Sequence, residues 1–294
     1  MKTLNFIGCG RVGRTLGRLW TSDGIFAIQD VLTRAAASAA AAVGFIGAGR
    51  AVTDPMAMRP SDVWLIATPD SDIAASGAQL AQSGMLRAGD IVFHVSGATP
   101  SSALDAVARH GALAASVHPI KTFVDAATAV ATFGGTCCSA EGDAAALAVL
   151  RPAFEAIGAT VFDIRPELKA VYHSGGVFAC NYLAALIEVA LACHEKAGIP
   201  RQTSMRAIEP MVRETVDAVF RDGPAAALTG PVTRGDAVTV AREIAALEAW
   251  NPLFATLYRE LARVALGLAE SGSRLDDENL ERLTAMLDKS APDA

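Results

Sequence analysis

Three hydrogen-bonding side chains stand in one mostly apolar stretch, KAVYHSGGVFACNYL, which runs from Lys169 to Leu183. At about 100° per residue in a helix, Lys169 and His173 lie about 40° apart on one face, and Asn181 is offset from His173 by about 80°. Lysine and histidine transfer protons in general acid–base catalysis, and an asparagine can position a reacting group. The catalytic hypothesis is therefore that Lys169 or His173 is the acid–base group and Asn181 is the positioning donor.

The same stretch carries a glycine pair, Gly175 and Gly176, between its polar residues. Glycine in a helix costs about 1 kcal/mol relative to alanine, so its presence there needs a reason. One interpretation is a patch without side chains, onto which a bound cofactor or a substrate can pack closely. The other is helix–helix packing through small residues, with Lys169 reaching solvent and His173 hydrogen-bonded in the core. Both stay open.

A glycine-rich turn near the N-terminus predicts a binding site for a dinucleotide. A short strand, Leu4–Ile7, leads into GCGRVG, where Gly8, Gly10 and Gly13 have the spacing G-x-G-x-x-G, and a helix follows. The first glycine makes the tight turn, the second lets the backbone approach a pyrophosphate, and the third lets helix and strand pack closely. The alternative is an ordinary strand–turn–helix. The expected cofactor contacts in this turn are Gly8, Cys9, Gly10, Arg11, Val12 and Gly13.

The end of the second predicted strand, Ala27–Leu32, indicates which dinucleotide fits. A site for NAD has an acidic residue about 20 residues after the glycines, where it binds the ribose 2′-hydroxyl. Thr33 and Arg34 occupy that place here. A hydroxyl and a guanidinium suit a 2′-phosphate, so the sequence predicts NADP as the cofactor. Two alternatives stay open: Arg34 is a solvent-exposed residue at a helix start, or Asp30 reaches the ribose.

Further strands at the spacing of β–α–β units are expected at Val63–Ala67, Ile91–Val95 and Leu113–Val117. Ligands of an open parallel sheet bind beyond the carboxyl ends of its strands, so the residues that follow should line one crevice. Asp70 has the alternative role of a helix cap, and His118 that of a structural histidine. The expected contacts are Ala67, Thr68, Pro69, Ser96 and Gly97 with the cofactor, and His118 and Pro119 with the substrate.

The second half of the chain has helical patterns without strand signals, which predicts a domain boundary near Pro166. We expect a Rossmann-type, doubly wound, mainly parallel α/β sheet at residues 1–165 and an all-helical domain at 166–294. Pro166 and Gly198 are typical of the start and the stop of one helix of about 30 residues. That helix is apolar on most sides and must be covered by its own domain or by a second subunit, so a homodimer through it is expected.

A glycine-rich segment, Ala227–Val240, interrupts the helices of the second half. Arg234 and Asp236 lie within it, and Asp236 is placed to cap the helix that follows. The segment is either a linker with an exposed charge pair or an active-site loop in which Arg234 binds an anionic substrate. Both interpretations stay open, since glycine-rich loops serve both purposes.

Composition limits the classes of function. The chain has 294 residues and a formal net charge of −6, which argues against a nucleic-acid surface. Its five cysteines form no C-x-x-C pair, so we expect reduced thiols and no metal site. No signal-peptide pattern is visible, and Asn181 and Glu188 interrupt the most apolar stretch, Gly176–Cys193. We therefore expect a cytoplasmic protein whose apolar helix is buried and does not span a membrane.

Several motifs together resemble a known family. They are GCGRVG at 8–13, ATPDSDI at 67–73, HVSG at 94–97, VHPIKTF at 117–123, LTGPVTRGD at 228–236 and the KAVYH helix. They resemble the Rossmann-like proteins with a C-terminal helical domain of unassigned function, which are similar to deazaflavin-dependent NADP oxidoreductases, pyrroline-5-carboxylate reductases and β-hydroxyacid dehydrogenases. The resemblance covers nearly the whole chain. It implies a Rossmann domain, a second domain like the C-terminal domain of 6-phosphogluconate dehydrogenase, and NADP, but no particular substrate.

The resemblance also bears on the polar helix. β-Hydroxyacid dehydrogenases carry a catalytic lysine on the long interdomain helix, followed by asparagines. Lys169 lies on the matching helix, but no Asn-Asn pair follows it, and His173 stands one turn further on. We expect an NADP-dependent oxidoreductase that transfers a hydride between nicotinamide and a small carbonyl, imine or hydroxyacid substrate. The alternative is a dinucleotide-binding sensor or scaffold without turnover, because the fold alone does not distinguish the two.

Overall fold

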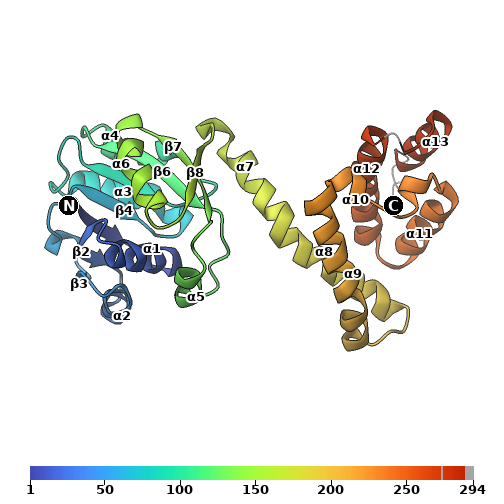
Figure 1. Ribbon diagram of the computed structural model, residues 1–294, viewed down its shortest axis with the longest axis horizontal. Coiled ribbons are helices and arrows are strands. Elements are labelled where there is room, and N and C mark those ends of the chain that lie inside the picture. The colour runs from blue at the N-terminus through green and yellow to red at the C-terminus, as the bar shows by residue number, and fades with distance from the viewer. Residues whose placement is uncertain (273, 289–294) are drawn as a thin grey trace. The chain divides into compact units, whose positions relative to one another are not determined.

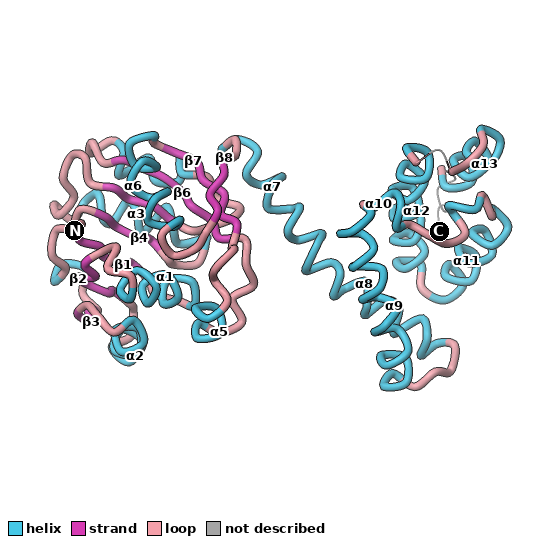
Figure 2. Tube along the Cα trace, viewed as in Figure 1, coloured by secondary structure: helices cyan, strands magenta, loops and turns pink. Residues whose placement is uncertain are grey.

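The computed structural model describes residues 1–272 and 274–288. The chain divides into two compact units, Met1–Asn181 and Tyr182–Ala294. The division falls inside the long helix, whereas the sequence prediction placed the domain boundary where that helix begins. Strands occur in the first unit, and the described residues of the second unit are helical or irregular (Figure 2). The predicted α/β sheet followed by an all-helical segment is thus confirmed.

One eight-stranded sheet forms the first unit, in the order β3-β2-β1-β4-β5-β6-β7-β8 (Figure 1). β6 and β7 pair antiparallel, and the other neighbours pair in parallel. The chain runs outward from β1 to β3 and then returns to β4, so the order reverses between β1 and β4, which is where such sheets bind ligands. The strands are β1 (Thr3–Ile7), β2 (Ala27–Leu32), β3 (Arg50–Val52), β4 (Val63–Ile66), β5 (Ile91–His94), β6 (Leu113–Pro119), β7 (Cys137–Gly142) and β8 (Thr160–Asp163).

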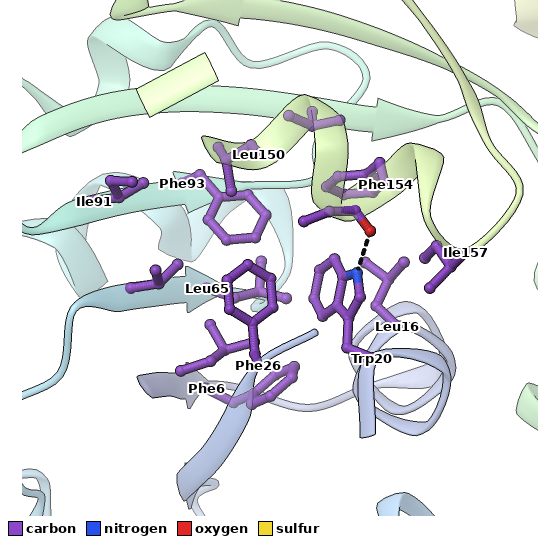
Figure 3. Close-up of a cluster of buried hydrophobic side chains, with 14 of the residues drawn as sticks. Phe6, Leu16, Trp20, Phe26, Leu65, Ile91, Phe93, Leu150, Phe154 and Ile157 are labelled. Atoms are coloured by element: carbon purple, nitrogen blue, oxygen red, sulfur yellow. Dashed lines mark hydrogen bonds between the residues drawn. The ribbon is translucent and has the colours of Figure 1, made fainter. Parts of the chain in front are cut away.

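Helices cover both faces of this sheet and bury its apolar strands. β4 is buried along its whole length, as expected for a central parallel strand. On one face, Trp20 of α1 packs edge-on against Phe154 of α6, with ring centroids 5.2 Å apart, and its indole N–H donates to the Ala153 carbonyl (Figure 3). The helices of this unit are α1 (Arg11–Ser22), α2 (Ala36–Ile46), α3 (Ile73–Gln82), α4 (Asp105–Ala108), α5 (Ala126–Ala131), α6 (Ala144–Glu155) and α7 (Lys169–Gly176).

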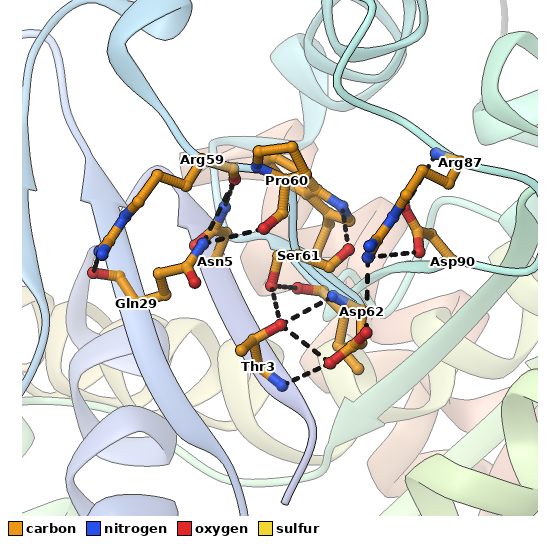
Figure 4. A network of polar contacts seen from close by, with 11 residues as sticks. Thr3, Asn5, Gln29, Arg59, Pro60, Ser61, Asp62, Arg87 and Asp90 are labelled. Carbon is orange, nitrogen blue, oxygen red and sulfur yellow. Dashed lines mark hydrogen bonds and ion pairs between the residues drawn. The ribbon is translucent and has the colours of Figure 1, made fainter.

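A closed polar network ties together the amino ends of the central strands (Figure 4). The Asp62 carboxylate accepts from the Thr3 backbone N–H at 2.8 Å and from the Thr3 hydroxyl at 2.9 Å. Arg87 pairs with Asp90 at 3.0 Å and with Asp62 at 3.4 Å. Because these groups satisfy one another, the network joins the starts of β1, β4 and β5 without help from any ligand.

The second unit is a set of helices around its own core. Val240, Ile244, Leu266 and Leu283 are among its buried residues. Side-chain caps begin three of the helices, as when Asp236 accepts from the Thr239 backbone N–H at 3.0 Å, which confirms the predicted cap. The helices are α8 (Tyr182–Lys196), α9 (Arg201–Asp222), α10 (Pro224–Ala227), α11 (Ala237–Trp250), α12 (Pro252–Ser271) and α13 (Asp277–Leu287).

The long helix runs over Pro166–Lys196, from a short 3-10 turn through α7, a π-helical turn at Val177–Asn181 and α8. By length and composition alone it is apolar enough to cross a membrane, and it is the one such helix among the described residues. Only 6% of its most apolar window is buried, and Val171 is 69% exposed. The expectation that its own domain covers this helix is therefore wrong for the single chain.

Candidate functional site

The glycine turn follows β1, and the surroundings of its three glycines differ from one another. At Gly8, φ is +77° and a Cβ would lie 2.9 Å from the Ala67 carbonyl oxygen, so the turn itself requires glycine. At Gly13 a Cβ would lie 3.3 Å from Cys9 Sγ and from the Ala67 side chain, which reflects tight helix–strand packing. At Gly10 a Cβ would meet no described atom within 4 Å. The backbone at Gly10 therefore faces open space, as a pyrophosphate-binding turn requires.

The start of α1 behind this turn has unpaired backbone donors. Its N-cap residue is Gly10, which has no side chain to accept from the first N–H groups. Burial raises the pKa of the neighbouring Cys9 thiol to about 12, with the charge of Arg14 opposing the shift. Cys9 is thus neutral at physiological pH and places no negative charge beside the helix start. An anion is favoured at this position by both the free N–H groups and the helix dipole.

Two clefts open beside the glycine turn, and they share Gly10, Ala67 and Thr68. The smaller has a volume of about 310 Å³ and the larger about 910 Å³. Between them they bring together most of the residues predicted to contact the cofactor. The predicted residues that line one or both clefts are Gly8, Cys9, Gly10, Arg11, Val12, Gly13, Thr33, Arg34, Ala67, Thr68, Pro69 and Ser96.

Two buried polar atoms of the larger cleft lack a hydrogen-bond partner among the described residues. They are Oγ1 of Thr68 and Nε of Arg14. Buried polar atoms are paired in more than about nine cases in ten, and these two belong to residues that line an open cleft, so both are available to a ligand bound there. Sequence reasoning missed Arg14, although it directly follows the last glycine of the motif.

Asp30 does not act as a ribose-binding acid. It is fully buried, and its carboxylate accepts from Arg50 Nε at 2.9 Å, from Arg59 Nη2 at 2.7 Å and from the Arg59 backbone N–H at 2.7 Å. Burial alone would raise its pKa, but the hydrogen bonds from the two arginines outweigh burial and lower the pKa. The alternative in which Asp30 reaches the ribose is therefore wrong. Arg34 is exposed and has no ion-pair partner within the described ranges.

Ser96 and Asp70 form a polar contact at the carboxyl ends of β4 and β5. The Ser96 hydroxyl donates to Asp70 Oδ2 at 2.7 Å and accepts from the Thr99 backbone N–H at 3.0 Å. No side chain caps the 3-10 turn at Asp70 or the following helix α3. Asp70 therefore orients the Ser96 loop, and the expectation that it caps a helix is wrong.

Lys169 is buried at the first residue of α7, with 1% of its side chain exposed. Its Nζ donates to Glu141 Oε1 at 2.8 Å and also to the Ser116 hydroxyl. The other carboxylate oxygen of Glu141 accepts from the Ser101 hydroxyl at 2.6 Å. Burial lowers the pKa of Lys169, and the Glu141 carboxylate opposes that shift. Lys169 thus fastens the long helix to β6 and β7, and the alternative in which it reaches solvent is wrong.

Two imidazoles meet over Gly97. A Cβ at Gly97 would lie 2.6 Å from His173 Cδ2 and 2.8 Å from His118 Nε2, so only glycine fits beneath these rings. The ring centroids of His118 and His173 are 6.2 Å apart, and His118 Nδ1 lies 3.0 Å from the Tyr172 hydroxyl. Burial lowers the pKa of His118 to about 4, and the charges of Lys169 and His173 add to that shift. Gly97, predicted as a cofactor contact, lines neither cleft and instead supports the histidine pair.

His94 is the last residue of β5, directly before the Ser96 loop, and it was not identified as a site residue from the sequence. Its Nδ1 accepts from the Ser96 backbone N–H at 3.2 Å, so Nε2 carries the proton and donates to the Pro100 carbonyl at 3.3 Å. Burial lowers its pKa to about 4. The sequence does carry a signal, because Ser116 and His118 stand two residues apart in one apolar strand and so lie on the same side of the sheet. Ser116 pairs with His94 across β5 and β6, which places His94 on that side as well.

The remaining predicted site residues are not among the lining residues of either cleft. Pro119 is buried as the last residue of β6, and Asn181 is exposed at the end of the π-helical turn. Arg234 is exposed in the second unit, in the 3-10 turn Val232–Arg234. A Cβ at Gly175 or Gly176 would meet no described atom within 4 Å, so packing of another helix of this chain against the glycine pair is not observed.

Comparison with known proteins agrees with this architecture. Residues 2–119 match the model of a Rossmann-like domain, and residues 136–265 match the model named Domain of unknown function (DUF2520). The chain is thus similar to a Rossmann-like domain over its first part and to the DUF2520 model over its second, which confirms the family resemblance seen in its motifs. None of the curated proteins compared with the chain matches it significantly in sequence.

Solved structures share this fold over nearly their whole length. Protein TM1727 from Thermotoga maritima is 25% identical, with 92% of this chain and 99% of that chain covered and a TM-score of 0.73. An imine reductase from Myxococcus stipitatus in complex with NADP+ is 17% identical, with coverage of 96% and 99% and a TM-score of 0.62. A pyrroline-5-carboxylate reductase from Coxiella burnetii is 14% identical, with coverage of 98% and 99% and a TM-score of 0.56. At these identities the two reductases show a shared fold.

Proposed function

We propose that the protein is an NADP-dependent oxidoreductase that transfers a hydride between nicotinamide and a small carbonyl, imine or hydroxyacid substrate. The observation that carries this proposal is the pairing of an open glycine turn at Gly10 with a cleft that contains unpaired arginines. The acid of β2, Asp30, is meanwhile fully engaged by Arg50 and Arg59. The β2 carboxylate is thus unavailable to a ribose 2′-hydroxyl, and the guanidinium groups of the cleft suit the 2′-phosphate that distinguishes NADP from NAD.

The cofactor, when bound, supplies the hydride, and the chain supplies binding and orientation. The N–H groups at the start of α1 are assigned to the pyrophosphate, and Thr33 and Arg34 to the 2′-phosphate. The orphan hydroxyl of Thr68 lies in both clefts and is assigned a hydrogen bond to the bound dinucleotide. The reductase fold shared with NADP-bound neighbours supports these assignments.

We assign the acid–base role to His173 and a positioning role to Lys169. His173 is partly exposed beside His118 at the carboxyl end of β6, whereas the Lys169 ammonium is buried and bonded to Glu141. By holding the first turn of α7 on the sheet, Lys169 fixes the direction in which His173 leaves the helix one turn later. Asn181 is retained as a positioning donor, and Arg234 as a contact for an anionic substrate.

We further propose that the protein is cytoplasmic and that two copies of it associate through the long helix. Such an association would cover the apolar face that the helix leaves exposed. Val171 and Leu183 expose apolar side chains along it, and a groove of about 390 Å³ lies between α8 and α9. Asn181 and Glu188 make a second protein surface a better cover than lipid. Sedimentation should give a dimer for the wild type and a monomer for Val171→Asp, while Val264→Asp on α12 stays dimeric. A monomeric wild type would remove this part of the proposal.

The catalytic proposal is tested by a screen of ketoacids and imines with NADPH, in which oxidation of the cofactor is followed by its absorbance. Turnover that His173→Ala abolishes, without loss of cofactor affinity, supports the assignment. Tight NADPH binding with no turnover of any substrate would instead favour a dinucleotide-dependent sensor.

A further inference from the structure

We propose that Arg14 is a second specificity-determining residue, which binds the 2′-phosphate of the cofactor together with Arg34. This inference rests on the proposed function, because it concerns the NADP site. It adds a residue from the glycine-turn helix to a contact that the sequence assigned only to the end of β2.

The first observation is where the two arginines lie. Arg14 stands in the first turn of α1, immediately after Gly13, and Arg34 follows β2. Both line the larger cleft, together with the hydroxyl residues Thr33 and Ser38. Arg14 does not line the smaller cleft, where Arg11 is found instead. Both arginines therefore line one cleft, in which a single bound dinucleotide can contact each of them.

The second observation is that neither guanidinium group has a protein partner among the described residues, whereas those of two nearby arginines do. Arg11 donates to the Phe123 carbonyl at 3.4 Å, and Arg18, one turn after Arg14, donates to the Ile46 carbonyl at 3.4 Å. Neither Arg14 nor Arg34 has an ion pair or a side-chain hydrogen bond among the described residues, and Arg14 Nε is buried without a partner. Leaving a buried charged donor unpaired is costly, so an anionic ligand is expected to complete it.

The chemistry of the cofactor selects which anion this is. The N–H groups at Gly10 and the start of α1 already provide for the pyrophosphate, which NAD and NADP share. A phosphomonoester carries about −1.5 to −2 charges at neutral pH and presents three acceptor oxygens, which suits two guanidinium groups. The 2′-phosphate is the phosphomonoester of NADP, and Arg34 already marks its place at the end of β2.

The test is calorimetric titration of the full-length protein with NADPH, NADH, 2′,5′-ADP and 5′-AMP. For Arg14→Met we expect affinity for NADPH and 2′,5′-ADP to fall by about tenfold or more, with NADH and 5′-AMP nearly unchanged. Arg18→Met, a matched change on the same helix outside the cleft, should leave all four affinities as in the wild type. Arg14→Lys keeps the charge without the planar fork and should give an intermediate loss, and it serves as the test variant if Arg14→Met does not fold.

Distinct outcomes separate failure of this inference from failure of the proposed function. Equal losses for NADPH and NADH in Arg14→Met would mean that Arg14 binds the pyrophosphate or supports the turn, and no loss at all would mean that it serves no ligand. Either result overturns the inference while the wild type still prefers NADPH. A wild type that binds neither dinucleotide would instead overturn the proposed function itself.

Discussion

The two ends of the sheet in the first unit treat their polar groups in opposite ways. At the amino end, Thr3, Asp62 and Arg87 satisfy one another in a closed network (Figure 4). At the carboxyl end, Thr68 Oγ1 and Arg14 Nε are buried without partners in the described part of the chain, and the backbone at Gly10 faces open space. Groups that are closed among themselves stabilise the fold, whereas groups left open are there for a ligand. The comparison predicts that changes at closed groups alter stability and that changes at open groups alter binding.

The largest effect on stability is expected at Lys169, a closed group at the carboxyl end of the sheet, because both partners of its ion pair with Glu141 are buried. Lys169→Met leaves the Glu141 carboxylate buried without its cation, which should cost about 3–5 kcal/mol of unfolding free energy. Chemical denaturation measures the loss. The double variant Lys169→Met/Glu141→Leu removes both charges and should recover much of the stability. A Lys169→Met protein as stable as the wild type would contradict the conclusion that the Lys169–Glu141 pair holds the long helix against β6 and β7.

Gly10→Ala should weaken dinucleotide binding on the order of 100-fold while the fold survives, since a Cβ there meets only the ligand. Gly8→Ala is the matched control, because its positive φ and its contact with the Ala67 carbonyl make it destabilising in the protein itself. Titration with NADPH beside thermal melts separates the two variants. A folded Gly10→Ala protein with unchanged affinity would show that the turn does not bind a pyrophosphate.

A pair of smaller changes compares the two ends directly. Asp62→Ala removes the acceptor for two Thr3 donors and should lower stability by about 1–2 kcal/mol, with cofactor affinity unchanged. Thr68→Val removes an unpaired buried hydroxyl and should keep or raise stability, while affinity for the dinucleotide falls by about tenfold. Stability and affinity that change together in both variants would contradict the division into closed and open groups.

Stability should depend on pH in two separate ranges, one set by histidines at the carboxyl end of the sheet and one set by Asp62 at the amino end. His94 and His118 have pKa values lowered from 6.5 to about 4 by burial, so the unfolded chain binds their protons first and stability falls as the pH drops from 6.5 towards 4. The pKa of Asp62 is lowered below 3.8, chiefly by the Thr3 backbone N–H, so its contribution is lost only at more acidic pH. Melts of His94→Asn should lack part of the first decline and keep the second.

The parts of the site that depend on local spacing were predictable from the sequence. Gly8, Gly10 and Gly13 follow a strand at fixed intervals, and Thr33 and Arg34 follow the next strand, so the turn and the cleft could be anticipated from neighbours along the chain. The doubly wound sheet followed from the same alternation of strands and helices.

Contacts between distant residues could not be predicted in this way. Asp30 was an open alternative because its partners, Arg50 and Arg59, are brought beside it by the folding of β3 and the following loop. Lys169 stayed a candidate for the acid–base role beside His173 because its partner Glu141 lies on β7, a strand that the sequence did not predict. Whether the long helix is buried depends on surfaces outside the helix itself, which its own periodicity does not describe.

The most direct test of the central claim is the affinity of the wild-type protein for NADPH compared with NADH, measured by titration under one salt condition. The open carboxyl end has free guanidinium groups in its larger cleft, and the acid of β2, Asp30, is paired with Arg50 and Arg59. A charge-assisted bond to the 2′-phosphate contributes about 1.5–3 kcal/mol, so NADPH should bind at least about tenfold more tightly. Equal affinities, or no binding of either nucleotide, would contradict the assignment of this end of the sheet as an NADP site.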